Sequence, residues 1–178
     1  MSSKKLDIII VLIGRICSGK STVAKVLSER LSFPLASFGN YLIAYCGQKN
    51  LPTDRASLQK VGQEMVNTNP TQFLQNVIDY HRGDSTSLVL DGIRHKVIFE
   101  SVKGLAKNVV AVFMDADLET RYKRYLTRNI IDYKTFLVLD THPVELETEI
   151  LKPFCDVVID STVNYENVLY DLIKKIAH

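Results

Sequence analysis

The sequence predicts an α/β protein in three layers, with a five-stranded parallel sheet covered by helices on both faces. Two observations lead to this fold class. Five short apolar runs alternate with longer segments whose apolar residues recur at helical spacing. The runs are nearly continuous in apolar residues, which is typical of parallel strands buried on both faces. With 178 residues, the chain is long enough for a well-buried core, and we expect a single domain over residues 1–178.

The first strand and the first helix enclose the most informative segment. Residues 6–13 form an apolar run that predicts a buried strand, and residues 22–31 carry apolar side chains at helical spacing. Between them, residues 14–21 (Gly-Arg-Ile-Cys-Ser-Gly-Lys-Ser) fit the phosphate-loop pattern G-x-x-x-x-G-K-[ST]. A strand before the loop and a helix after it are the context that this motif requires.

The chemistry of such a loop follows from its residue types. Glycines let backbone N–H groups curl around phosphate oxygens, and the helix N-terminus adds a favourable dipole. Lys20 can reach the β- and γ-phosphates of a nucleotide, and the Ser21 hydroxyl can ligate Mg²⁺. We therefore assign a continuous stretch to the nucleotide phosphates: Gly14, Arg15, Ile16, Cys17, Ser18, Gly19, Lys20, Ser21 and Thr22.

The second strand is expected at residues 33–38, where Pro34 is tolerated near the strand start and Gly39 ends the strand. Helices follow at residues 41–48 and 55–66. Four apolar residues share one side of the second of these helices: Leu58, Val61, Met65 and Val66. The next helix begins at Asn69-Pro70, because asparagine is a good N-cap and proline suits the first helical position.

The second half of the chain continues the alternation. Apolar runs predict strands at residues 87–91, 108–115 and 155–160. The segments between and after them predict helices: 95–105, a basic helix at 118–128, two short helices within 130–151 around His142-Pro143, and 165–176.

In a parallel sheet, ligands bind at the carboxyl ends of the strands. Phe38 and Gly39 follow the second strand and Asp91 ends the third, so these residues meet the phosphate loop at one edge. A carboxylate at the position of Asp91 can hold Mg²⁺ or orient an acceptor, although it could also be only the N-cap of the next helix. Arg94 could grip a second phosphate with two hydrogen bonds, or it could be a surface arginine.

Further arginines offer positive charge for phosphates. Arg121, Arg124 and Arg128 are three and four residues apart, so they can share one helix face, which is either a phosphate clamp or a solvated basic face. Transfer of a phosphoryl group needs cations around that group, which favours the clamp. Arg55 stands at a helix start, where the dipole disfavours a cation, so it has either a phosphate-binding or a structural role.

Composition excludes several classes of function. The net charge of +2 does not suggest a surface that coats nucleic acid, and no apolar run reaches the length of a membrane span. The three cysteines have no metal-binding spacing, and their scatter suits a reducing cytosol, so we expect a cytoplasmic protein. The four histidines form no cluster and are interpreted as surface residues.

With these residues in place, the chain resembles the nucleoside monophosphate kinase group of phosphate-loop kinases. That group includes adenylate kinases, phage-type deoxynucleoside monophosphate kinases and dephospho-coenzyme A kinase. Residues 90–94 (Leu-Asp-Gly-Ile-Arg) resemble the Asp-Gly strand end whose arginine binds the acceptor phosphate in adenylate kinases. Residues 55–62 are similar to the Arg-x-x-Leu-Gln-x-x-Gly segment of deoxynucleotide-type kinases, which lies in the part that binds the acceptor.

The resemblance implies further roles. It places Arg55 and Gln59 at the acceptor, Arg121 and Arg124 at the start of a lid that clamps phosphates, and residues 154–160 in the final strand. It also implies an acceptor-binding insertion at about residues 38–83 and a lid at about residues 121–145. Asn40 stands where relatives often have an aspartate, and residues 41–43 supply no arginine where adenylate kinases place one. These departures argue against adenylate kinase activity and leave the acceptor open.

The sequence thus predicts a phosphate-loop kinase that uses ATP and Mg²⁺, with a nucleoside or deoxynucleoside monophosphate as acceptor. The catalytic residues would be Lys20, Asp91, Arg121 and Arg124, with Ser21 and Asp91 at the metal. The acceptor would be bound by Phe38, Gly39, Arg55, Gln59 and Arg94. One alternative is a kinase of another small acceptor such as dephospho-coenzyme A. Another is a regulatory nucleotide-binding ATPase, although the Asn-Lys-x-Asp motif of guanine-specific switches is absent.

Overall fold

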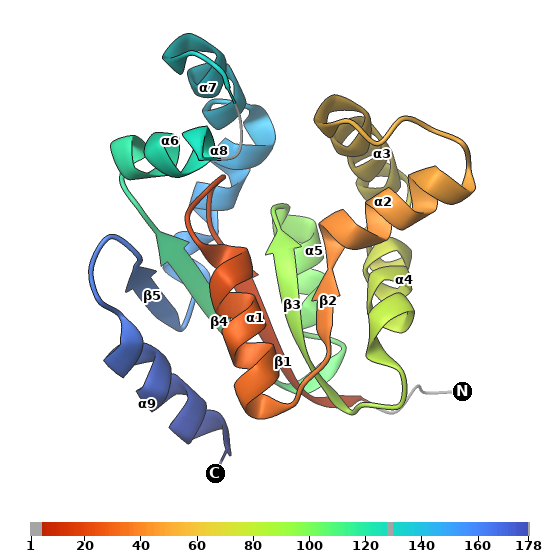
Figure 1. Ribbon diagram of the computed structural model, residues 1–178. Helices are drawn as coiled ribbons and strands as arrows, with labels where there is room; N and C mark the ends of the chain where they lie inside the picture. Colours follow the sequence, from red (N-terminus) through yellow and green to blue (C-terminus); the bar gives the residue numbers. More distant parts are fainter. Residues whose placement is uncertain (1–4, 128–129, 178) are drawn as a thin grey trace.

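A computed structural model describes residues 5–127 and 130–177 of the chain (Figure 1). Within these residues, one parallel sheet has the strand order β2-β3-β1-β4-β5. Its strands are β1 (Leu6–Ile13), β2 (Leu35–Ser37), β3 (Ser87–Ile93), β4 (Ala106–Asp115) and β5 (Val157–Asp160). The predicted fold class is confirmed.

Helices cover both faces of this sheet. They are α1 (Lys20–Leu31), α2 (Phe38–Gln48), α3 (Arg55–Thr68), α4 (Pro70–Arg82), α5 (Lys96–Val102), α6 (Leu118–Leu126), α7 (Tyr133–Asp140), α8 (Pro143–Ile150), the short 3-10 helix η1 (Lys152–Phe154) and α9 (Glu166–Ala177). None of these described helices combines the length and the apolar character that crossing a membrane would need.

The hydrophobic core lies in two layers because side chains alternate along each strand. On β1, Ile10 and Leu12 pack with α1 and α9, whereas Ile9, Val11 and Ile13 pack with α4 and α5. All five side chains are fully buried, and burying one of them stabilises the fold by roughly 1.5–3 kcal/mol. The central strand therefore holds the loop that follows it on a rigid base.

The boundary between β2 and α2 differs from the prediction. The strand is shorter than residues 33–38, and the helix starts at Phe38 instead of residue 41. The reason is a local cap: the Ser37 hydroxyl oxygen accepts a hydrogen bond from the Asn40 backbone N–H at 3.3 Å. Gly39 consequently lies in the first turn of α2 and does not end a strand.

The end of β3 also differs from the prediction. Strand β3 continues through Ile93, past the predicted end at residue 91, so Asp91 lies inside the strand. Asp91 is therefore not a helix cap, and the N-cap of α5 is His95. The predicted pair of short helices on either side of His142-Pro143 is confirmed by α7 and α8.

Two groups of helices rise above the carboxyl edge of the sheet. Figure 1 shows α6, α7 and α8 on one side, α2 and α3 on the other, and the loop between β1 and α1 at the sheet edge between them. The segment expected as a lid, at about residues 121–145, includes most of α6 and all of α7. The segment expected as an acceptor-binding insertion, at about residues 38–83, includes α2 and α3.

Candidate active site

The loop between β1 and α1 has the backbone that its glycines allow. Gly14 and Gly19 have positive φ angles of 146° and 95°. A β-carbon on Gly14 would lie 2.4 Å from the carbonyl oxygen of Met114, closer than a real side chain can come. Gly19 is the N-cap of α1, and no side chain caps this helix. The first turn of α1 therefore keeps backbone N–H groups directed at the loop, as an anion site requires.

Lys20 is a buried cation at the start of α1. Its side-chain ammonium donates a hydrogen bond to the carbonyl oxygen of Arg15 at 2.6 Å, and the residue is 7% exposed. Burial is the largest influence on its pKa, and it lowers the pKa from 10.5 to about 7 with help from the positive charge of Arg94. Asp91 acts in the opposite direction. An anion placed against Lys20 would therefore stabilise its protonated form.

Ser21 and Asp91 join the loop to strand β3. The Ser21 hydroxyl donates to one carboxylate oxygen of Asp91 at 2.8 Å. The other oxygen of Asp91, Oδ1, is buried and has no hydrogen-bond partner among the described residues. A hydroxyl and a carboxylate are ligands that Mg²⁺ accepts, and this ion normally takes its remaining oxygens from water and phosphate. The pair fits a magnesium site, and no group of three or more metal-ligating side chains occurs in residues 5–127 and 130–177.

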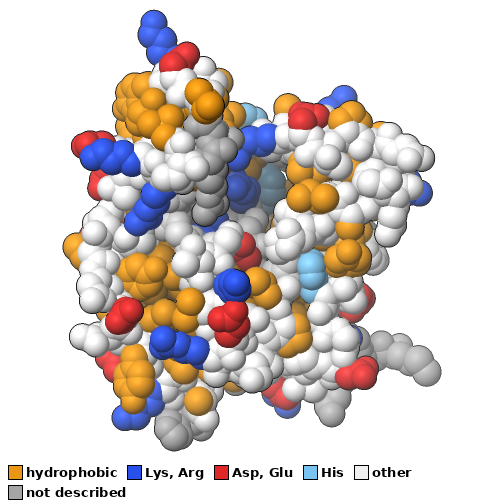
Figure 2. Space-filling view, viewed as in Figure 1, with side chains coloured by type: hydrophobic (Ala, Val, Ile, Leu, Met, Phe, Trp, Pro, Cys, Tyr) orange, Lys and Arg blue, Asp and Glu red, His pale blue; other side chains and the backbone are white. Residues whose placement is uncertain are grey.

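A cavity of about 930 Å³ opens beside the loop. In Figure 2 it is a hollow between the two raised groups of helices, with Lys, Arg and His side chains in its wall. The part under α2 and α3 is apolar, with amide groups interspersed. The apolar side chains there include Phe38, Leu42, Leu58, Val66 and Phe73, and the amides include Asn40, Gln59 and Gln63. Of the predicted acceptor residues, Phe38, Gly39, Arg55, Gln59 and Arg94 all line this cavity.

Arg55 and Arg94 share one carboxylate. Arg55 begins α3 and Arg94 follows β3, yet both contact the same oxygen of Glu145, Arg55 at 3.4 Å and Arg94 more closely. Burial, followed by repulsion from Arg55, lowers the pKa of Arg94 to about 10. Glu145 is fully buried, and its second oxygen accepts a hydrogen bond from the Ile16 backbone N–H at 2.8 Å.

Sequence reasoning missed Glu145. Its only local signal is its place in the first turn of α8, where a glutamate is ordinary because it complements the helix dipole. Its partners lie 51, 90 and 129 residues away along the chain, so no short motif could reveal them.

The two lid arginines have different surroundings. Arg121 is buried, forms an ion pair with Asp140 through both terminal nitrogens, and donates from Nε to the Ala116 carbonyl at 3.0 Å. It does not line the described cavity. Asp140 also binds Arg15 of the loop at 2.8 Å. Helices α6 and α7 are thereby linked to each other and to Arg15 of the phosphate loop.

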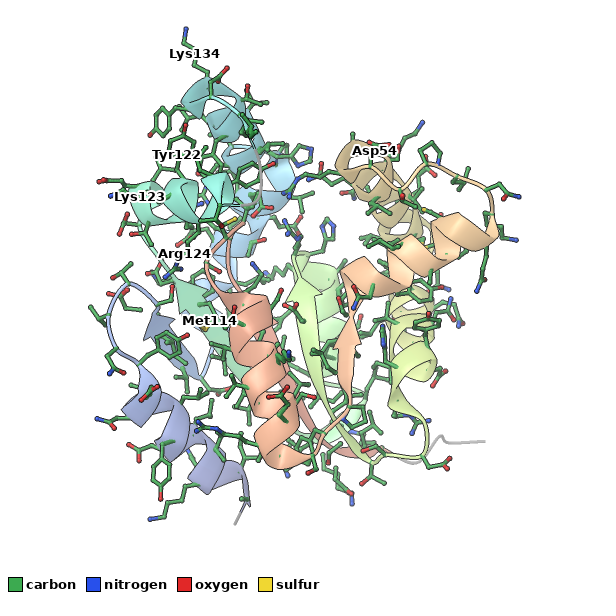
Figure 3. All side chains as sticks on the ribbon, viewed as in Figure 1. Asp54, Met114, Tyr122, Lys123, Arg124 and Lys134 are labelled. Atoms are coloured by element: carbon green, nitrogen blue, oxygen red, sulfur yellow. The ribbon has the colours of Figure 1, made fainter. Side chains whose placement is uncertain are left out.

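Arg124, by contrast, lines the cavity. It donates to the Ser161 hydroxyl at 2.8 Å and to the Ser161 carbonyl at 2.6 Å. Figure 3 shows Arg124 on the side of α6 nearer the phosphate loop, whereas Lys123 extends away from it. The third predicted lid arginine, Arg128, lies outside the described residues.

His95 differs from the expectation of a surface histidine. Its side chain is 14% exposed and lines the cavity, and its Nδ1 atom lies 2.9 Å from a carboxylate oxygen of Glu147. Helix α8 thus contacts two consecutive residues after β3: Glu145 binds Arg94, and Glu147 binds His95. The sequence could not indicate this pairing because the partners are 52 residues apart.

Comparison with known proteins agrees with this geometry. Residues 10–152 match the model of the family described as an AAA domain (AAA_18), and the chain belongs to this phosphate-loop family. No protein among those with curated functions matches it.

Several solved structures have a similar fold over nearly the whole chain. Shikimate kinase from Aquifex aeolicus is 18% identical with a TM-score of 0.58, covering 95% of this chain and 96% of that one. Gluconokinase from Sinorhizobium meliloti 1021 is 15% identical with a TM-score of 0.60, covering 98% and 94%. The protein TT1252 from Thermus thermophilus is 18% identical with a TM-score of 0.60, covering 98% and 97%. The chain therefore has the fold of small-molecule phosphate-loop kinases.

Proposed function

We propose that this protein is a kinase that transfers a phosphoryl group from ATP to a small acceptor in the presence of Mg²⁺. The observation that carries the proposal is the arrangement of one cavity. The phosphate loop with Lys20 and the Ser21–Asp91 pair forms one end, and the Arg55–Arg94 pair forms another wall. A kinase of an anionic acceptor needs two such anion sites, one for each substrate, because catalysis of phosphoryl transfer is almost entirely positioning and charge stabilisation.

In this proposal the residues divide between the two substrates. Lys20 and the loop amides hold the donor phosphates, while Ser21 and Asp91 hold Mg²⁺, which neutralises phosphate charge when bound. Arg94 and Arg55 hold an acid group of the acceptor. Arg124 faces the cavity and supplies positive charge to the transferring group. Arg121 does not face the cavity; it binds Asp140, which in turn orients Arg15 of the phosphate loop.

We infer further that the acceptor is a nucleoside or deoxynucleoside monophosphate. The cavity wall beyond the arginines is apolar and includes aromatic rings, as suits the flat face of a base. The amides of Gln59 and Gln63 lie in the same wall and each offers a donor and an acceptor to a base edge. Arg55 and Arg94 supply a fork for the monophosphate.

A second candidate is a kinase whose acceptor is a hydroxy acid. His95 favours it, because this side chain lines the cavity and Glu147 binds its Nδ1 atom, which leaves Nε2 as a group that could accept a hydroxyl proton. The similar structures include kinases named for shikimate and gluconate, both of which are hydroxy acids. The arginine pair would then hold a carboxylate instead of a phosphate.

One experiment distinguishes these candidate functions. The protein is incubated with ATP and Mg²⁺ and with one acceptor at a time, from a panel of nucleoside and deoxynucleoside monophosphates, dephospho-coenzyme A, shikimate and gluconate. ADP and the phosphorylated product are both quantified. We expect transfer to one or a few of the monophosphates. Transfer only to a hydroxy acid would favour the second candidate, and ADP release that no acceptor stimulates would favour a regulatory ATPase.

A further inference from the structure

Glu145 connects the two ends of the cavity. Its carboxylate is fully buried and contacts three donors from three separate elements. One oxygen accepts from Arg55 at the start of α3 and from Arg94 after β3, and the other accepts from the Ile16 N–H of the phosphate loop. A single side chain therefore touches the loop on the donor side and both arginines on the acceptor side.

The charges around Glu145 explain why a carboxylate is needed there. Arg55 lies close enough to Arg94 that it lowers the pKa of Arg94, and Lys20 lies in the same cavity. Without an acid between them, two long cationic side chains would separate and sample other rotamers. One carboxylate offsets this repulsion and restricts both guanidinium groups to one place.

Glu145 also leaves the arginines able to bind a ligand. It contacts Nη2 of Arg55 and Nη1 of Arg94, one nitrogen of each fork. The Nε atom of Arg55 is buried and has no hydrogen-bond partner in the described part of the chain. Because each guanidinium carries five N–H donors, most of the capacity for an anion is retained.

We propose that Glu145 is a positioning residue that sets the distance and orientation of the acceptor arginines relative to the phosphate loop. This inference rests on the proposed function insofar as Arg55 and Arg94 are taken to bind the acceptor. Its effect would be on alignment, because a displacement of about 1 Å between reacting groups can slow an enzyme about a hundredfold. Since Glu145 lies on α8, the lid and the acceptor site would be aligned by the same residue.

The test compares three variants with the parent. Glu145→Gln keeps the size and removes the charge, Glu145→Asp keeps the charge on a shorter stem, and Glu149→Gln is the control. Glu149 lies on the same helix, is partly exposed, and contacts Lys152; neither residue lines the cavity. The kinetic constants for both substrates and the thermal midpoint are measured for each protein, with the acceptor that the panel identifies.

We expect Glu145→Gln to lower kcat about ten- to a hundredfold while the KM for the acceptor stays the same or falls, because the freed arginine charge still attracts the anion. The KM for ATP should change less than about twofold, because the loop itself is intact. Glu145→Asp should recover part of kcat, and Glu149→Gln should match the parent. An unchanged kcat, or a loss explained by a lower fraction of folded protein, would overturn the proposal. A higher kcat would instead identify Glu145 as a block to the acceptor.

A second measurement does not depend on turnover. In the parent, NMR signals of the Arg55 and Arg94 Nε–H groups should be those of restrained side chains, and both should shift and broaden in Glu145→Gln. The Arg124 signal should not change, because Ser161 holds that side chain. If no acceptor is phosphorylated by the parent, the proposed function fails, and these signals still decide whether Glu145 positions the arginines. Unchanged signals for Arg55 and Arg94 would refute the positioning role.

Discussion

The phosphate loop and the cavity wall that contains Arg55 and Arg94 differ in how far their polar and charged groups already have partners. At the loop and the adjoining end of β3, buried polar groups are left open. The Ser18 hydroxyl and Oδ1 of Asp91 have no partner among the described residues, and Lys20 is held where its charge is disfavoured. In the cavity wall, Arg55 and Arg94 already share an acid, Glu145. A second acid, Asp140, binds Arg15 of the loop and Arg121, which does not line the cavity.

This difference indicates what each region contributes. The charge of Lys20 in the loop is not offset by a closely bound acid among the described residues, so the loop should bind anions strongly. This binding should depend on pH because Lys20 titrates near neutral pH. In the wall, one carboxylate serves two arginines, so part of their positive charge is already offset. That acid restricts geometry instead, which favours selection of an acceptor over raw affinity. Four substitutions or titrations test this contrast.

The largest effect is expected from Lys20→Ala. Removal of the loop cation should lower the rate of phosphoryl transfer by at least about a hundredfold, comparable to the loss of one preorganised donor to a developing charge. The thermal midpoint should stay the same or rise, because the charged form of Lys20 is disfavoured by burial. Turnover and thermal unfolding are measured beside Lys25→Ala, an exposed lysine of the same helix. Near-parental turnover in a folded Lys20→Ala protein would rule out the role of the loop.

Arg94→Ala should weaken binding of the acceptor and leave binding of ATP nearly unchanged. Loss of an arginine–phosphate fork should weaken acceptor binding by about ten- to a hundredfold, equivalent to roughly 1.5–3 kcal/mol. Binding of ATP should change little, because its phosphates lie against the loop. Calorimetry with each substrate separately checks this, and Arg30→Ala on the exposed side of α1 is the control. An equal loss for ATP would mean that the two regions are not separate anion sites.

The pH dependence of ATP binding should report on Lys20. Its pKa is lowered to about 7 in the free protein, and a bound phosphate should raise it again. Between the free and bound pKa values, binding then takes up about one proton and weakens by about tenfold for each pH unit of increase. Calorimetry at pH 8 in Tris and in HEPES measures this uptake. Lys20→Arg stays protonated and should take up almost none, and an identical uptake in both proteins would exclude Lys20 as its source.

The same shift has a consequence for stability. Below pH 7 both the folded and unfolded states carry a protonated Lys20, and the burial penalty is fully present. As the pH rises from about 7 towards 10.5, the folded state loses this proton before the unfolded state does, so the contribution of Lys20 to the free energy of unfolding becomes more favourable.

The smallest effect is expected from Ser21→Ala. The hydroxyl is one ligand among several oxygens that Mg²⁺ would have, so its removal should raise the Mg²⁺ concentration for half-maximal activity by roughly three- to tenfold. Asp91 would keep its place in β3 and its role at the metal. Titrations of Mg²⁺ at fixed ATP compare Ser21→Ala with Lys25→Ala, an exposed residue of α1 that does not line the cavity. Superimposable titrations of Ser21→Ala and the parent would exclude the hydroxyl as a ligand.

The sheet and the phosphate loop could be predicted from local sequence. Both depend on short stretches of chain: the apolar run before Gly14, the glycines with positive φ, and the helix that starts at Lys20. The start of α2 also depends on neighbouring residues. The prediction placed it at residue 41 instead of Phe38 because Ser37 was not recognised as the N-cap. Where neighbouring residues decide a structure, their identities are enough to predict it.

The pairing of charged side chains could not be predicted in this way. Arg55 and Arg94 were identified from their positions, but nothing in the sequence paired them with Glu145, or His95 with Glu147. Arg121 and Arg124 have similar local sequence, yet one is buried against Asp140 and the other lines the cavity. These interactions join residues that are far apart in the chain and are brought together by the packing of α6, α7 and α8 over the sheet edge. Side-chain type gives the charge of a residue, whereas the fold selects its partner.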